Sequence, residues 1–249
     1  MRLLFINPNT SADLTEQGAR VARSVARPDT EIVPATGRFG ARYIATRAAA
    51  AIAGHAALDV FARAGKGADV VLLACFGDPG LFALRELSPV PVVGMAEASC
   101  HLASTLGRKF AIVTGGHRWG PMLEEFVAAI GLTANLAAVR TVAPSGGEIA
   151  ANPDAALELL AQACVEAVQR DGADVVILGG LGFSGLAGRI AAKVPVPLID
   201  NVVAAVRMAE AAAALNVAKP RSGSFAPTAP VRTTGLSAEL AALIEGQKK

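Results

Sequence analysis

The chain carries a second copy of one of its own segments, and this internal repeat limits the folds it can adopt. Residues 67–81 read GADVVLLACFGDPGL and residues 172–186 read GADVVILGGLGFSGL, with nine of fifteen positions identical. Each copy has the pattern of a buried strand followed by a glycine-rich turn. That turn opens with Cys75 in the first copy and with Gly180 in the second. Because a duplicated fold places equivalent loops on two sides of one cleft, we expect a thiol on one side to face bare backbone on the other.

The repeat continues on both sides of this pair. LLFINPN at residues 3–9 aligns with FAIVTGG at 110–116, which matches Asn7 to Thr114. SPVPVVG and VPVPLID, ending at Gly94 and Asp200, align in the same way. The sequence therefore predicts two lobes and a tail, over residues 1–105, 106–200 and 216–249.

Two segments lie outside this simple division. Helix 201–215 is a candidate to cross back to the first lobe. Residues 217–238 are rich in Pro, Ser, Thr and Gly, which indicates an irregular strap or tail, followed by a short helix near 237–246.

Short apolar runs alternate with Ala-rich helical stretches along the chain. Continuous apolar runs are typical of parallel strands that are buried on both faces. The expected strands are residues 3–6, 31–34, 70–74, 92–94, 110–114, 139–142, 175–178 and 198–199. The expected helices are residues 12–26, 43–65, 79–86, 96–106, 119–130, 153–170, 184–192 and 201–215. This order predicts an α/β fold of two pseudo-symmetric open parallel-sheet lobes, with the active cleft between them.

Composition excludes several classes of partner. The chain has 249 residues, of which 53% are hydrophobic and 18% charged, and a net charge of +2, so nothing favours nucleic acid or a membrane surface. No apolar run reaches the length of a membrane span. The odd set of three cysteines and three scattered histidines lacks metal-like spacing and indicates a reducing, cytoplasmic setting with no metal. Low charge and Ala-rich helices are compatible with a homo-oligomer.

Four loops follow strands at the ends where open parallel sheets bind ligands. They cover residues 7–11, 75–80, 114–119 and 180–185. We expect these loops to converge on one cleft if the two lobes face each other.

Cys75 is the residue in these loops best suited to chemistry. It ends a strand, and Pro79 is a plausible helix start, so backbone N–H groups and the helix dipole are expected to lower its thiol pKa. Cys100 and Cys164 lie inside helical stretches and are interpreted as packing residues.

Polar and glycine residues of the same loops form the expected binding surface. Backbone amides there can hold a carboxylate or a developing enolate oxygen. Asp78 has an alternative role as a turn or helix-capping residue. The 38–43 loop, with Arg38, Arg42 and Tyr43, is a candidate lid. The predicted substrate-binding residues are Asn7, Phe76, Gly77, Asp78, Thr114, Gly115, Gly116, Gly180, Leu181 and Gly182.

Residues 180–185 also spell GxGxxG, with Asp200 twenty residues on, which matches a dinucleotide-binding fingerprint. The equivalent loop of the first half has Cys75 in the first glycine position and Gly94 in place of the acid. We therefore interpret the motif as the second copy of a substrate loop, and NAD-dependent oxidoreduction as the least favoured reading.

Taken together, these loops resemble the aspartate/glutamate/hydantoin racemase superfamily, and within it the hydantoin and allantoin racemases. The matching segments are INPNTS at 6–11, ACFGDPGL at 74–81, VVGMAEA at 92–98, VTGG at 113–116 and LGGLGFSGL at 178–186. The resemblance implies a two-lobe fold and a cofactor-free mechanism with one cysteine per lobe. One thiolate removes a proton beside a carbonyl, and the other thiol donates a proton to the opposite face.

The sequence departs from that pattern at Gly180, where the second family cysteine is expected. The leading hypothesis is a cofactor-independent racemase or isomerase of a small carbonyl or carboxylate substrate, with Cys75 as the acid/base. In one form of it, a water held by Gly180 and neighbouring amides delivers the second proton, which predicts slow racemisation. The alternatives are a cofactor-free decarboxylase or other lyase that uses Cys75 as a single-face proton donor, and a non-catalytic small-molecule binding protein.

Overall fold

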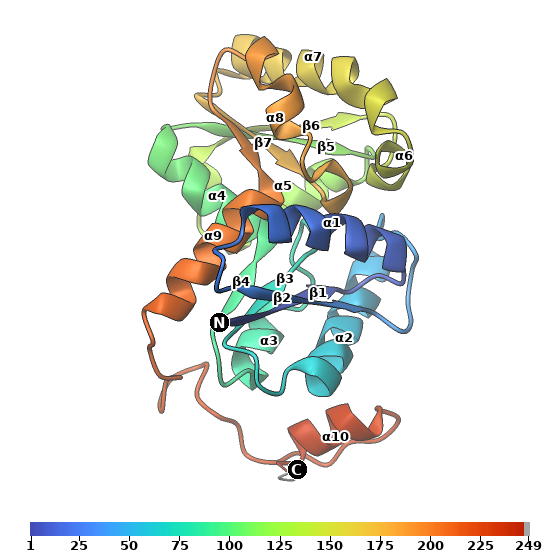
Figure 1. The fold of residues 1–249 in the computed structure, drawn as a ribbon, viewed down its shortest axis with the longest axis vertical. Coiled ribbons are helices and arrows are strands. Elements are labelled where there is room, and N and C mark those ends of the chain that lie inside the picture. The colour runs from blue at the N-terminus through green and yellow to red at the C-terminus, as the bar shows by residue number, and fades with distance from the viewer. Residues whose placement is uncertain (247–249) are drawn as a thin grey trace.

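Two α/β lobes, one above the other in Figure 1, make up the computed structural model, which describes residues 1–246. The first lobe holds a parallel sheet in the order β2-β1-β3-β4, and the second holds a parallel sheet in the order β6-β5-β7-β8. The two orders are the same once each strand of the first lobe is matched to its repeat in the second. The predicted α/β fold with two pseudo-symmetric parallel sheets is confirmed.

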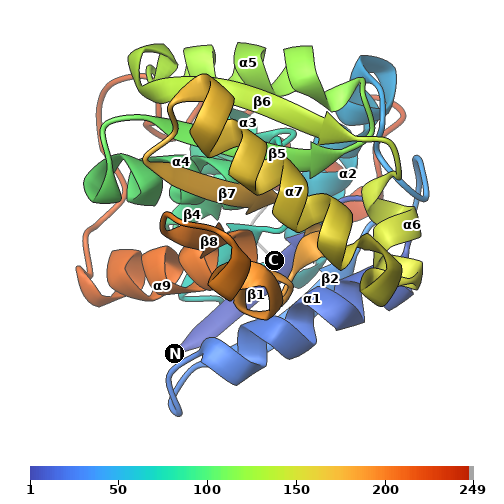
Figure 2. The same cartoon turned by 90° about the horizontal axis from the view of Figure 1, so that it is seen from above.

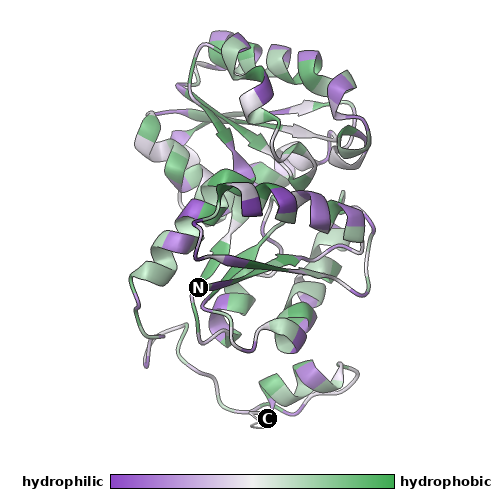
Figure 3. Cartoon of the chain, viewed as in Figure 1, coloured by the Kyte–Doolittle hydropathy of each residue, from purple (hydrophilic) through white to green (hydrophobic). Residues whose placement is uncertain are grey.

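Each sheet is built from the apolar runs that the sequence pattern indicated. The central strands β3 and β7 are buried along their whole length, as the lack of alternation predicts. In Figure 3 much of both sheets has the green of hydrophobic residues. The first sheet contains β1 (Arg2–Asn7), β2 (Glu31–Thr36), β3 (Val70–Leu73) and β4 (Val92–Gly94). The second contains β5 (Phe110–Gly115), β6 (Leu136–Val142), β7 (Val175–Gly179) and β8 (Leu198–Asp200).

Most helices also form where they were predicted. The α-helices of the described residues are α1 (Ala12–Val25), α2 (Arg47–Ala64), α3 (Leu81–Leu87), α4 (Met95–Leu106), α5 (Trp119–Ala129), α6 (Gly146–Ala151), α7 (Pro153–Asp171), α8 (Ala187–Ile190), α9 (Asn201–Ala214) and α10 (Ala238–Ile244). Figure 2 shows α7 lying across the second sheet, where it contacts β5, β6 and β7.

Two helix predictions were wrong in their extent, and one helix was missed. The helix predicted over 43–65 begins only at Arg47, because the Thr46 side chain accepts the N–H of Ala49 and caps it. The helix predicted over 184–192 is interrupted, since Gly185 has φ +82, and only α8 and short 3-10 turns remain. Helix α6 was missed, although Ser145 and Glu148 form a capping box at its start.

The helices that follow the last strand of each sheet pack across the lobes. Helix α4 leaves the first sheet and lies against β7 of the second, whereas α9 leaves the second sheet and lies against β3 and β4 of the first. The two helices also pack on each other (Figure 1). The lobe limits predicted at residues 105 and 200 do not take these two crossing helices into account, and they stay a prediction.

One hydrophobic core joins the inner faces of both sheets. It includes Leu3 and Phe5 of β1, Phe110 and Ile112 of β5, and Val202 of α9, each with no exposed surface. Full burial of such side chains contributes roughly 1.5–3 kcal/mol each to folding. Each lobe also has one smaller core of its own, under its outer helices. The shared core therefore fixes the relative position of the sheets.

The segment after α9 runs along the first lobe without regular structure until α10, which packs on α2 (Figure 1). Lys219 anchors this segment, because its Nζ donates to the backbone oxygens of Arg85 and Ser88 at the end of α3. The predicted tail ends at residue 249, and its last three residues lie outside the described part of the chain. Within residues 1–246, no helix is long and apolar enough to cross a membrane.

Glu210 provides a test of the packing of α9 on the first lobe. Its carboxylate is 1% exposed and accepts the N–H of Arg27 (2.6 Å) and the hydroxyl of Thr30 (2.9 Å). We expect Glu210→Ala to lower the free energy of unfolding by about 2–4 kcal/mol, because it removes a buried carboxylate that accepts two hydrogen bonds and pairs with Arg27 and Arg207. Chemical denaturation checks this. The control is Glu16→Ala, which breaks an exposed ion pair with Arg23 and is expected to change stability little. Equal effects of the two substitutions would contradict the assigned role of Glu210.

Candidate active site between the lobes

The carboxyl ends of β1, β3, β5 and β7 meet at a small cavity between the lobes, with a volume of about 30 Å³. Loops from both halves of the repeat line it. Seven of the predicted site residues line it: Asn7, Cys75, Phe76, Thr114, Gly180, Leu181 and Gly182. Gly77, Asp78, Gly115 and Gly116 are not among them. The structure thus brings all four predicted loops to one place.

Cys75 follows β3 directly and is 8% exposed. Burial raises the pKa of its thiol well above the usual range, and the nearby carboxylate of Asp78 raises it further. The predicted lowering of this pKa was therefore wrong. Its physical reason is that α3 begins only at Leu81, after Gly80 at φ +84, so the first turn of the helix does not reach the thiol. In the free protein Cys75 is a neutral thiol, which is a proton donor.

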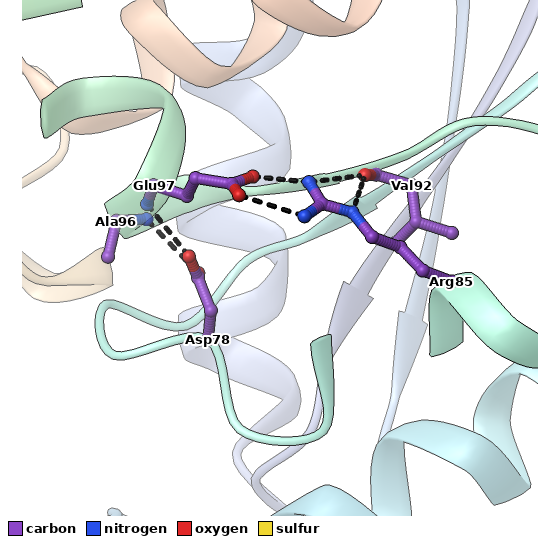
Figure 4. Close-up of polar contacts among 5 residues, drawn as sticks. All are labelled: Asp78, Arg85, Val92, Ala96 and Glu97. Carbon is purple, nitrogen blue, oxygen red and sulfur yellow. Dashed lines mark hydrogen bonds and ion pairs between the residues drawn. The ribbon is translucent and has the colours of Figure 1, made fainter. Parts of the chain in front are cut away.

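Asp78 caps a helix, which is the alternative role that the sequence indicated for it. Its carboxylate accepts the N–H groups of Ala96 (3.0 Å) and Glu97 (2.8 Å) in the first turn of α4, whose own N-cap, Gly94, has no side chain (Figure 4). Burial raises the pKa of Asp78 to about 8, although these two hydrogen bonds oppose the rise. Asp78 thereby ties the Cys75 loop to the helix that crosses between the lobes.

An ion pair supports this capped turn from the side. Arg85 donates Nη1 to Glu97 (2.8 Å), pairs with it again through Nη2, and donates Nε to the carbonyl of Val92 (3.1 Å) (Figure 4). Glu97 is thus held by Arg85 and faces α3, which leaves it no contact with the Cys75 thiol in this arrangement.

Asn7 is fully buried at the end of β1 and organises the loop that follows it. Its Nδ2 donates to Oδ1 of Asn9 (2.8 Å) and to Oγ1 of Thr15 (2.9 Å), and its Oδ1 accepts the N–H of Asn9 (3.3 Å). Asn9 also lines the cavity. The amide of Asn7 therefore shapes the wall of the cavity by holding the 7–11 loop.

Aromatic side chains from each lobe pack on glycines of the other. Phe76 lies against β7, where a Cβ added to Gly179 would be 2.5 Å from its ring. Trp119 lies over the Cys75 loop, where a Cβ on Gly77 would be 2.7 Å from the indole. Gly77 therefore contributes to the site by admitting Trp119, which the sequence analysis did not single out. Thr114 is buried at the end of β5, as its alignment with Asn7 indicated.

Gly180 occupies the position that matches Cys75, with φ +138. A Cβ built there would be 3.8 Å from the ring of Phe183 and 4.0 Å from Oγ1 of Thr114, so the site has room for a side chain. The φ angle is nevertheless one that residues with a Cβ rarely adopt. Asn201 holds the loop by donating Nδ2 to the carbonyl of Gly180 (2.7 Å).

Asp200 is used as a helix cap, which argues against the dinucleotide fingerprint. Its carboxylate accepts the N–H of Val202 at the start of α9 (3.0 Å) and the N–H of Gly185 in the loop after β7 (2.6 Å). In a dinucleotide-binding site, the carboxylate oxygens of this acidic residue would have to accept a hydrogen bond from the ribose hydroxyl.

Tyr43 completes the cavity from the 37–46 loop. Its Oη accepts the N–H of Gly146 at the start of α6 (2.9 Å), so it bridges the two lobes. Arg38 instead pairs with Asp59, and Arg42 lies near Asp13. Of the three residues proposed from sequence as a lid, only Tyr43 reaches the cavity.

Comparison with known proteins identifies the family of this chain. The model of the Asp/Glu/Hydantoin racemase family matches residues 3–209. The chain belongs to the Asp/Glu/hydantoin racemase family. It is 39% identical over 229 residues to the hydantoin racemase of Paenarthrobacter aurescens, which covers 90% of this chain and 96% of that protein. The resemblance seen in the loop motifs is thereby confirmed.

Solved structures give the same result for the fold. Allantoin racemase from Pseudomonas fluorescens superposes with a TM-score of 0.91 at 34% identity, covering 94% of this chain and 100% of that one. Arylmalonate decarboxylase superposes with a TM-score of 0.60 at 17% identity, covering 99% of this chain and 100% of that one. At this low identity, the similarity to arylmalonate decarboxylase shows a shared fold alone.

The burial of the thiols predicts their reactivity. Cys75, Cys100 and Cys164 are all buried, and burial raises the pKa of each. We expect none of the three to react rapidly with DTNB at pH 8 in the folded protein, and all three to react in denaturant. Absorbance at 412 nm measures both. One rapidly reacting thiol that disappears in Cys75→Ser would contradict the neutral, shielded state of Cys75.

Proposed function

We propose that this protein is a cofactor-independent racemase or isomerase that moves a proton at the carbon beside a carbonyl of a hydantoin-like substrate. The observation that carries the proposal is the position of Cys75 in the cavity between the lobes of an Asp/Glu/hydantoin racemase family member. The hydantoin racemase and allantoin racemase similarities supply the substrate class.

The proposed step is a proton transfer to and from sulfur. Since Cys75 rests as a neutral thiol, a hydroxide ion from solvent first removes its proton. The thiolate then takes the proton from the ring carbon, and the electron pair of the broken C–H bond spreads into the neighbouring carbonyl. Backbone amides of the 75–80 and 180–182 loops would stabilise the resulting oxyanion. Since the ring carbonyl itself accepts the charge, the proposed reaction needs no cofactor. Return of a proton to the opposite face inverts the configuration.

The lining of the cavity supports a neutral ring as substrate. Its walls are formed by amide, hydroxyl, aromatic and aliphatic side chains together with glycine backbone, and no Asp, Glu, Lys or Arg is among the described residues that line it. A dicarboxylate would enter such a site without a counter-charge, at a large desolvation penalty.

A decarboxylase or related lyase is the second candidate, and the state of Cys75 favours it. Burial keeps this residue a neutral thiol, and Gly180 supplies no second thiol on the facing loop. A substrate that loses CO2 leaves a carbanion that needs one proton on one face only. Cys75 would donate that proton, and water would restore the thiol.

Hydrogen exchange distinguishes these functions. One enantiomer of 5-isopropylhydantoin is incubated in D2O with the native protein, and deuteration and optical rotation are followed against a buffer blank. We expect deuteration with inversion, and a loss of at least 100-fold in Cys75→Ser, because the hydroxyl is a far weaker acid and base. The control is Cys100→Ser, since Cys100 lies within α4 and does not line the cavity.

Other outcomes contradict the racemase. Activity that survives Cys75→Ser would exclude Cys75 as the acid/base. CO2 release from a 2-substituted malonate without any hydantoin exchange would establish the lyase instead. Saturable binding of the hydantoin with no exchange and no CO2 release would identify a binding protein.

Gly180 offers a gain-of-function test. A side chain fits at this position, but φ +138 requires the loop to shift when a Cβ is added. Gly180→Ala and Gly180→Cys carry the same backbone strain, so their difference reports the thiol alone. We expect racemisation by Gly180→Cys to exceed that by Gly180→Ala at least tenfold. Equal rates in the two variants would contradict a vacant acid/base position at residue 180.

A further inference from the structure

Replacement of the second family cysteine by Gly180 leaves one face of the proposed substrate without an obvious proton donor. Inversion needs an acid/base group on each face of the planar carbanion. Any replacement has to lie on the same cavity as Cys75 and has to ionise. The inference below rests on the proposed racemase function and concerns this second group.

Among the described residues that line the cavity, only Cys75 and Tyr43 have side chains that ionise. The remaining polar lining groups are the amides of Asn7 and Asn9, the hydroxyl of Thr114 and the indole of Trp119. Amides and indoles do not exchange protons at useful rates near neutral pH, and an aliphatic hydroxyl is a much weaker acid than a phenol.

Tyr43 also links the two lobes. Its backbone belongs to the first lobe, as Cys75 does, but its Oη is hydrogen-bonded to the N–H of Gly146 in the second lobe (2.9 Å). Gly146 in turn packs tightly on the loop that carries the vacancy, since a Cβ added to Gly182 would be 2.1 Å from the Gly146 carbonyl oxygen. The phenol is therefore tied to the neighbourhood of Gly180.

The surroundings of the hydroxyl suit a proton donor that becomes a phenolate. Burial raises the pKa of Tyr43, and Cys75 and Glu148 add to the rise. The N–H of Gly146 and the indole of Trp119 act in the opposite direction, because they donate to the phenol oxygen and stabilise its anion. In the resting protein Tyr43 is thus a neutral phenol with donors ready for the charge that follows proton loss.

A route for restoring the proton is also present. A larger pocket of about 510 Å³ lies outside the cavity and shares Tyr43 and Leu14 with it. Arg42 and Glu148 lie on the walls of this outer pocket. Tyr43 therefore lies on the wall shared by the cavity and the larger pocket, from which water can exchange protons with it.

We propose that Tyr43 is the second acid/base, in the place of the missing cysteine. The pair works with one proton fewer than in the resting protein, because a hydroxide ion from solvent removes the Cys75 proton before the first turnover. For one enantiomer, the Cys75 thiolate takes the ring proton and the Tyr43 phenol donates its proton to the opposite face, which leaves Cys75 as thiol and Tyr43 as phenolate. For the other enantiomer, the phenolate takes the proton and the Cys75 thiol donates. Between turnovers, water in the outer pocket restores the starting protonation states.

Tyr43→Phe tests this assignment, because it removes only the oxygen. We expect inversion of 5-isopropylhydantoin to fall at least 100-fold. In D2O the variant should still exchange the ring hydrogen of one enantiomer with retention, through Cys75, and should not exchange the other. Inversion at the native rate, or equal exchange of both enantiomers, would overturn the role of Tyr43 and leave the racemase function intact. A native protein that neither exchanges nor inverts the substrate would overturn both.

A second measurement keeps the test independent of folding defects. Tyr43 is the single tyrosine of the chain, so biosynthetic replacement of tyrosine by 3-fluorotyrosine changes this side chain alone. Fluorination makes the phenol more acidic, and we expect the alkaline limb of the kcat profile to move to lower pH with it. Phenolate absorbance near 295 nm follows the same titration in the folded protein. A shift in absorbance without a shift in the kcat profile would overturn the proposal, as a purely structural Tyr43 predicts that result.

Discussion

The packing of α4 and α9 across the lobes is the interaction on which the rest of this structure depends. Each helix follows the last strand of one sheet and covers the other sheet, and the two helices contact each other. The inner faces of both sheets thereby share one hydrophobic core. Because a close-packed core deforms little, it holds the carboxyl ends of four strands at a constant separation. The cavity with Cys75 exists only while this separation is kept.

The same packing explains why the loops of the two lobes meet so tightly. Trp119 and Phe76 each cross the boundary and press on a glycine of the opposite lobe. Asp78 connects the Cys75 loop to α4 through two backbone N–H groups, so the loop position follows the crossing helix. The Cys75 thiol is therefore buried and uncharged. The reaction that it can take part in depends on the groups of the facing 180–182 loop. At Gly180 that loop has no side chain, and Tyr43 is the other ionisable residue among the described residues that line the cavity.

Much of the arrangement was predictable because it depends on local patterns. Apolar runs identified the strands, and the alignment of Asn7 with Thr114 and of Cys75 with Gly180 identified the loops that line the cavity. Tyr43 was predicted only as part of a candidate lid, and Trp119 only as the end of the 114–119 loop. Their exact places depend on contacts with Gly146 and Gly77, far away in sequence. The capping pair Ser145 and Glu148 signalled α6, but two glycines at its start weaken the helical pattern.

The amino-acid sequence by itself determined the duplicated α/β fold, the family and the asymmetry between Cys75 and Gly180, because hydrophobic periodicity and repeated turns act over short stretches of chain. Only the tertiary structure decided the ionisation state of Cys75, the capping role of Asp78 and the place of Tyr43 beside the second lobe. Each of these depends on burial and on hydrogen bonds between distant segments, which no local pattern records. The pKa of a thiol is set by the atoms that surround it, and those atoms come together only when the two lobes are packed.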